Sequence, residues 1–167
     1  MLFRSVAFQR EPDREKATAM AQETERRFRE LGSPSMVAHT LEGRALIEVN
    51  AGDLNAAAPF LSEAVAHFAG ASNLGCTAHA LEAVAVWAAA QGDRGAAAEL
   101  VGAADTLREL SGAGHKPWEV RASHTDYDAG ILGDSDETQE AVARGRLHSF
   151  ASAAAFAAAL LAASSYA

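Results

Sequence analysis

Helical patterning runs along most of the chain, and short stretches containing glycine or proline interrupt it. Asp, Asn or Ser starts several segments, where its side chain can accept the free N–H groups of a first helical turn, and Gly often follows the last turn. No segment alternates apolar and polar residues for long enough to predict a strand. The pattern predicts about eight helices, over residues 13–31, 35–51, 53–68, 72–91, 93–110, 118–132, 136–147 and 149–163.

An internal repeat is the strongest pattern. When residues 38–64 are aligned with residues 78–104, which is a 40-residue period, 11 of the 27 positions are identical. Such periods are typical of stacked supersecondary units, here a helix, a Gly-Asp turn and a second helix. The most specific matches are His39 with His79, Leu41-Glu42 with Leu81-Glu82, and Gly52-Asp53 with Gly92-Asp93.

The residues that recur suggest how the units pack. Small side chains at Ala45, Ala57 and Ala64 would let antiparallel helices approach closely, and larger ones would fill the space between layers. A single helix pair cannot bury its apolar face, so neighbouring pairs must stack. The helices from Asp136 onward break the period and would cap the stack. The larger residues expected between layers are Leu41, Leu61 and Phe68.

Composition supports helices and excludes several classes of protein. The chain contains 41 alanines among 167 residues, and alanine favours helices and disfavours strands. The net charge of −8 argues against a protein that binds nucleic acid by neutralising phosphates. The single cysteine, Cys76, excludes an internal disulfide and a zinc site built from several cysteines.

Neither end of the chain predicts export or a membrane span. The first ten residues lack the apolar core of a signal peptide. The most apolar stretch, residues 150–163, is shorter than the roughly 20 residues that cross a bilayer. We therefore expect a cytoplasmic protein without membrane contact.

Several repeat residues stand at the spacing of the tetratricopeptide (TPR) signature, and these are Leu41, Ala45, Gly52-Asp53, Ala57, Leu61 and Ala64. The unit is longer than the usual TPR unit, so it resembles a TPR variant. The resemblance implies an all-α fold, a TPR-like antiparallel helix-pair superhelix. Residues 1–12 would be a flexible segment, residues 13–112 the repeats, and residues 113–167 the C-terminal capping helices.

The region from about Asp13 to Ala159 further resembles the C-terminal helical part of actinobacterial LuxR-type and AfsR-like ATPase regulators, some of which carry an adenylate cyclase domain. The similar motifs are Ala88-Ala89-Ala90-Gln91-Gly92-Asp93, Gly102-Ala103-Ala104 with Leu107-Arg108-Glu109, and Gly145-Arg146 with Ser149. The sequence departs from that family at Val142, where Trp is frequent, and at Ala151 and Ser152, where acidic residues are frequent. The resemblance implies a protein-interaction or regulatory module of a signalling or transcriptional regulator.

Domains typical of those regulators are missing from this sequence. It contains no P-loop motif and no helix-turn-helix after the repeats. Whether the chain is a stand-alone protein or part of a longer parent stays open.

Two histidine-glutamate pairs, His39 with Glu42 and His79 with Glu82, are the sharpest candidates for chemistry. Residues three apart share one helix face, and His and Glu are common ligands of zinc and iron. A metal site needs three or four convergent ligands, whereas a duplicated repeat would simply copy its surface residues. We therefore assign no metal and no cofactor, and keep a small-molecule or metal-binding sensor as the alternative function.

A groove along the first helix of each unit is the expected partner-binding surface. Its mixture of apolar and acidic side chains would suit an amphipathic helix or an extended peptide with a basic residue. The other possible occupants are the missing domains of a longer parent, and a homodimer is also plausible because the ends of a stack need capping. The groove residues are His39, Glu42, Leu46, Val49, His79, Glu82, Val86 and Ala89.

No arrangement of residues predicts an enzyme. Cys76 stands three residues before His79, but a lone cysteine near a helix start is more often a small buried hydrophobe. Ser123-His124 and the aspartates that follow lie in one short segment, whereas catalytic triads are normally assembled from separated segments. The basic residues Arg26, Arg27 and Arg29 alternate with glutamates, which favours a solvated helix face over a nucleic-acid contact.

Overall fold

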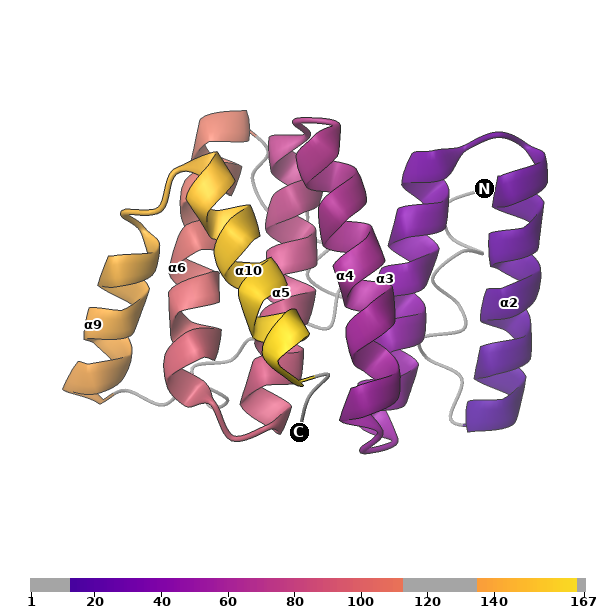
Figure 1. Ribbon diagram of the computed structural model, residues 1–167, viewed down its shortest axis with the longest axis horizontal. Helices are drawn as coiled ribbons and strands as arrows, with labels where there is room; N and C mark the ends of the chain where they lie inside the picture. Colours follow the sequence, from indigo (N-terminus) through magenta and orange to yellow (C-terminus); the bar gives the residue numbers. More distant parts are fainter. Residues whose placement is uncertain (1–12, 113–134, 165–167) are drawn as a thin grey trace.

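The computed structural model describes residues 13–112 and 135–164, and in these ranges the chain forms seven helices and no strand (Figure 1). The predicted all-α, helix-pair architecture is therefore confirmed for the described residues. The predicted helix over 118–132 and the N-terminal segment 1–12 lie outside them. The helices are α2 (Arg14–Glu30), α3 (Pro34–Asn50), α4 (Leu54–Gly70), α5 (Leu74–Ala90), α6 (Arg94–Ser111), α9 (Asp136–Gly145) and α10 (Phe150–Ser164).

Each of the turns between α2 and α6 has the same length. One residue in every turn adopts a left-handed backbone conformation, and these residues stand at the evenly spaced positions 32, 52, 72 and 92. Glycine fits this conformation without strain, as at Gly52 and Gly92, but Ser72 adopts it with φ of 52°. The structural period is thus one helix and one turn, which is half of the period seen in the sequence.

Aspartate or asparagine side chains cap the N-termini of four of the helices, as the sequence pattern predicts. Asp53 accepts a hydrogen bond from Ala56 N at 3.1 Å, and Asp93 accepts one from Ala96 N at 2.9 Å. Asp13 and Asn73 cap α2 and α5 in the same way. These caps satisfy N–H groups that have no partner within the helix, and each typically stabilises its helix by about 1 kcal/mol.

Helix α5 lies at the centre of the molecule, where it contacts α3, α4, α6 and α10. Ala45, Ala57 and Ala64 are fully buried, so the prediction that these alanines lie where helices touch is confirmed. The larger side chains predicted between the layers, Leu41, Leu61 and Phe68, are also buried in the main core.

Helices α6 and α9 cross at two glycines. A Cβ atom built on Gly102 would lie 2.0 Å from Val142 O, and one built on Gly145 would lie 1.9 Å from Glu99 O. Any larger residue at either position would therefore push the two backbones apart. Beyond this crossing, α10 does not continue the series of antiparallel helices but packs back against α4 and α5 (Figure 1). Its buried residues are Ala153, Ala157 and Leu161.

Helix α2 is attached at the other end by few apolar contacts. Ala17 and Ala21 pack against Ile47 in a small buried cluster that is separate from the main core. Arg44 also bonds Glu25 at 2.5 Å and lies 4.1 Å from the centre of the Phe60 ring. Burial would raise the pKa of Glu25, but the hydrogen bonds from neighbouring arginines outweigh it and lower that pKa. An ion pair therefore supplements a small apolar cluster where α2 packs against α3.

Among the described helices, none combines the length and the apolar character that crossing a lipid bilayer demands.

Candidate histidine-glutamate site

Three of the predicted residues meet between α3 and α5. His39 and Glu42 lie one turn apart on α3, and His79 comes from α5. The Nδ1 atoms of His39 and His79 lie 2.8 and 3.0 Å from the same oxygen, Glu42 Oε2. The sequence repeat therefore brings the two histidines together around one carboxylate.

Glu42 is buried, whereas its two histidines reach the surface. The Glu42 side chain is 1% exposed, compared with 32% for His39 and 23% for His79. The second carboxylate oxygen, Glu42 Oε1, is buried and has no hydrogen-bond partner among the residues that the structure describes. A buried carboxylate normally has all its lone pairs satisfied, so this oxygen is an unusual feature of the core.

Charge attraction dominates the electrostatics of the cluster. Burial alone would raise the pKa of Glu42, but the adjacent His79 and His39 hold it at about 2. Burial alone would lower the pKa of both histidines, yet the Glu42 carboxylate raises that of His39 to about 10 and also raises that of His79. The cluster therefore favours a charged carboxylate with protonated imidazoles around it.

Two further side chains hold the His39 ring. The ring centre lies 4.7 Å from that of Phe68. Cys76 Sγ lies 3.5 Å from His39 Nε2, on the side of the ring away from Glu42. Sequence reasoning connected Cys76 with His79, its neighbour on the helix, but the sulfur contacts His39 from the preceding unit.

Glu82, the repeat equivalent of Glu42, does not join the cluster. Its two oxygens accept hydrogen bonds from Arg108 Nε and Nη2, both at 2.6 Å, in a buried bidentate pair. Arg108 occupies the repeat position equivalent to that of Phe68, so the residue that packs on His39 in one unit is replaced by an arginine in the next. The two glutamates thus have identical positions in the repeat and different partners.

The predicted groove residues divide into covered and accessible groups. Glu42, Leu46, Val49 and Glu82 are buried, so little of their surface can meet a partner. The side chains that remain partly accessible are those of His39, His79, Val86 and Ala89.

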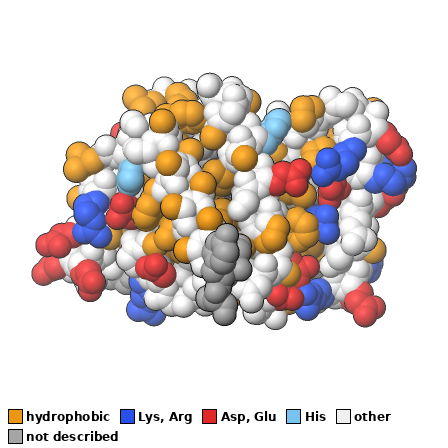
Figure 2. Space-filling view, viewed as in Figure 1, with side chains coloured by type: hydrophobic (Ala, Val, Ile, Leu, Met, Phe, Trp, Pro, Cys, Tyr) orange, Lys and Arg blue, Asp and Glu red, His pale blue; other side chains and the backbone are white. Residues whose placement is uncertain are grey.

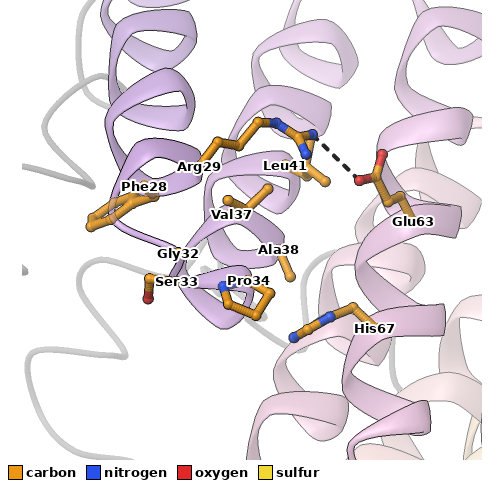
Figure 3. A pocket seen from close by; sticks show the side chains of 10 residues that line it. All are labelled: Phe28, Arg29, Gly32, Ser33, Pro34, Val37, Ala38, Leu41, Glu63 and His67. Carbon is orange, nitrogen blue, oxygen red and sulfur yellow. Dashed lines mark hydrogen bonds and ion pairs between the residues drawn. The ribbon is translucent and has the colours of Figure 1, made fainter.

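Sequence reasoning missed a separate pocket beside the first turn of α3. Its volume is about 400 Å³, and its walls come from α2, α3 and α4 (Figure 3). The apolar wall includes Phe28, Val37 and Leu41, and Arg29 bonds Glu63 at 3.5 Å beside it. Eight of the ten lining residues fall within residues 28–41, around the turn from α2 to α3, and the pocket is completed by Glu63 and His67 of α4. Packing of α4 against this turn closes the pocket, which is why no local pattern revealed it.

Charged side chains gather at the two ends of the molecule in Figure 2, and the middle of that face is mostly apolar or uncharged. On α2, Arg26 pairs with Glu23 and Glu30, and Arg29 pairs with Glu25. These pairs within one helix agree with the solvated, self-neutralised face that the interleaved charges predict.

Comparisons with known proteins add no relative. No family model matches the chain, and neither the curated proteins nor the solved structures contain a significant match.

Proposed function

We propose that this chain is a protein-interaction module of a bacterial signalling or transcriptional regulator, and that its pocket between α2, α3 and α4 receives a side chain of the partner. The open pocket is the observation that carries the proposal. Its volume of about 400 Å³ exceeds that of one large apolar side chain, and its wall is mainly apolar. Apolar anchors in such pockets supply much of the binding energy in protein interfaces.

The rim of the pocket favours a partner with a basic residue beside its apolar anchor. Glu63 is more than half exposed at the rim, and its ion pair with Arg29 is long, at 3.5 Å. A lysine or arginine of the partner can therefore bind Glu63 without first breaking a tight pair. The net charge of −8 also favours approach of a basic segment.

The regulatory role rests on the resemblance of the repeat and C-terminal motifs to LuxR-type and AfsR-like regulators. In that setting, the ATPase and DNA-binding activities belong to other polypeptide segments or to partner proteins. Binding of a peptide segment to this module would then bias those activities. The packing of α2, α3 and α4 supports the role because these helices already form the cavity that a partner side chain would enter.

Site-specific photo-crosslinking in cells of the organism that naturally makes this protein tests the proposal. A photo-crosslinking amino acid replaces Glu63 at the rim, and a matched chain carries it at Arg144, an exposed position on α9. We expect one defined protein to crosslink from position 63 and not from position 144. The crosslink should disappear when His67→Trp fills the opening. Equal crosslinking from both positions would show that the pocket is not the docking surface.

A further inference from the structure

The buried carboxylate of Glu42 has one oxygen that no group in the described structure satisfies. Glu82, at the same position in the repeat, has both oxygens bound by the Arg108 guanidinium. Around Glu42, the corresponding cation is absent because Phe68 stands where Arg108 stands in the next unit. Two histidines converge on Glu42 instead, and Glu42 Oε1 is left without a partner.

We propose that His39, Glu42 and His79 form a zinc-binding site that joins α3 to α5. Each residue offers one ligand atom, and these atoms all lie within 4.8 Å of one another. Two imidazoles and one carboxylate are a donor set that zinc binds with a water molecule in the fourth position. Because both imidazoles are protonated beside Glu42, binding of zinc at Nδ1 would release one proton from each ring to solvent. The proposal does not rest on the peptide pocket, which lies between α2, α3 and α4, although both places share residues of α3.

Zinc coordination would require all three ligand atoms to move. In a tetrahedral site with bonds of about 2.0–2.1 Å, neighbouring ligand atoms are about 3.3 Å apart. The two Nδ1 atoms lie 2.8 and 3.0 Å from Glu42 Oε2, so each would move outward by about 0.3–0.5 Å. The ligand atoms all lie within 4.8 Å of one another, so the widest pair would have to approach by up to about 1.5 Å through rotation of the side chains.

The surroundings suit a metal site that solvent can reach. The partial exposure of both histidines gives an entry path and leaves room for a water ligand. Glu42 Oε1 can then bind the metal as a second carboxylate oxygen or accept a hydrogen bond from that water. The Cys76 sulfur, 3.5 Å from His39 Nε2, is placed as the outer contact that orients a ligating imidazole.

Zinc at this position would link two successive repeat units. His39 and Glu42 belong to the first helix of one unit, and His79 belongs to the first helix of the next. A bond from each unit to the same ion would hold α3 and α5 at a fixed separation. The bound metal would therefore stabilise the stack against separation of its units.

The test uses the full chain without a polyhistidine tag, stripped of metal by a chelator and studied at pH 7.5. Zinc is titrated in competition with a chromophoric chelator, and cobalt(II) is added separately to report coordination geometry by its visible spectrum. The variants are His39→Ala and His79→Ala, whose partly exposed positions tolerate truncation better than Glu42. The matched control is His148→Ala. His148 Nε2 lies 2.8 Å from Glu99 Oε1, but no second histidine of the described structure completes a ligand set there.

We expect one zinc ion per chain, a tetrahedral cobalt spectrum, and a higher melting temperature when zinc is added. Each of His39→Ala and His79→Ala should weaken zinc binding by at least about 100-fold, and Cys76→Ser by about 10-fold. His148→Ala should leave the affinity within about threefold of the original. Absence of stoichiometric zinc, an octahedral cobalt spectrum, or unchanged affinity in either ligand variant would overturn the assignment.

Discussion

The crossing of α6 and α9 gives the most direct prediction from the structure. In Gly102→Ala the new methyl group would lie 2.0 Å from Val142 O, whereas a carbon and an oxygen in contact are normally about 3.3 Å apart. The backbone oxygen belongs to a helix and cannot rotate away, so α9 must move by roughly 1 Å. Overpacking of this kind usually costs about 1–3 kcal/mol.

We expect Gly102→Ala to lower the free energy of unfolding by about 2–3 kcal/mol, because the backbone clash offers no side-chain escape. For a chain of this size, about 1 kcal/mol shifts the melting temperature by about 2–4 °C. Thermal and urea unfolding followed by circular dichroism measure both quantities. Gly145→Ala should have a similar effect, and the double variant should cost less than the sum, since one methyl group already separates the helices.

Gly95→Ala is the matched control within α6. The nearest atom to its new Cβ, Asp93 Oδ1, is 3.7 Å away, which is ordinary van der Waals contact. Alanine favours helices over glycine by up to about 1 kcal/mol, so this variant should be as stable as the original or more stable. If Gly102→Ala proved as stable as Gly95→Ala, the close crossing of α6 and α9 would be refuted.

Three other features give predictions that standard unfolding measurements can check. Ser72→Gly should stabilise the chain by about 0.5–1 kcal/mol in urea unfolding, because glycine removes the strain of the left-handed backbone; a loss of stability would contradict the turn geometry. Arg108→Met should cost about 3–5 kcal/mol by leaving the buried Glu82 carboxylate without its guanidinium, and adding Glu82→Leu should recover much of that loss; equal stability of both variants would exclude a buried pair. The lowered pKa of Glu25 contributes stability that is fully present above its unfolded pKa of about 4.5 and is lost as the pH falls through the folded pKa. Melting temperatures measured from pH 7 to pH 3 should therefore show that the stability advantage of the original chain over Glu25→Gln shrinks as the pH falls. A constant difference would argue against the contacts of Glu25 with Arg29 and Arg44.

Local patterns were sufficient to predict the seven described helices, most of their caps and the packing alanines. The Gly52-Asp53 turn is an example, since glycine supplies the left-handed conformation and the adjacent aspartate caps the next helix. Ala45 and Ala64 were predicted at helix contacts because their positions recur with the repeat, and both are fully buried. These features depend on neighbours in the sequence or on the repeat itself.

Partners from distant segments could not be predicted in the same way. Glu42 and Glu82 are identical in the repeat, yet one meets two histidines and the other meets Arg108 from the following helix. The crossing of Gly102 and Gly145 joins residues far apart in the sequence, with a segment between them outside the described residues. Both outcomes depend on how whole helices pack, which no periodicity in a single segment reveals.

The equal turns limit how a chain of this kind can gain or lose length. Removing one helix with its turn would leave the helices on either side pointing in the same direction although only a short turn joins them. Removing an up-and-down pair restores both the direction and the buried face of every helix that follows. Duplication and deletion in whole pairs are therefore the changes that the architecture tolerates. This accounts for identities that recur at every second helix in a structure whose turns recur at every helix.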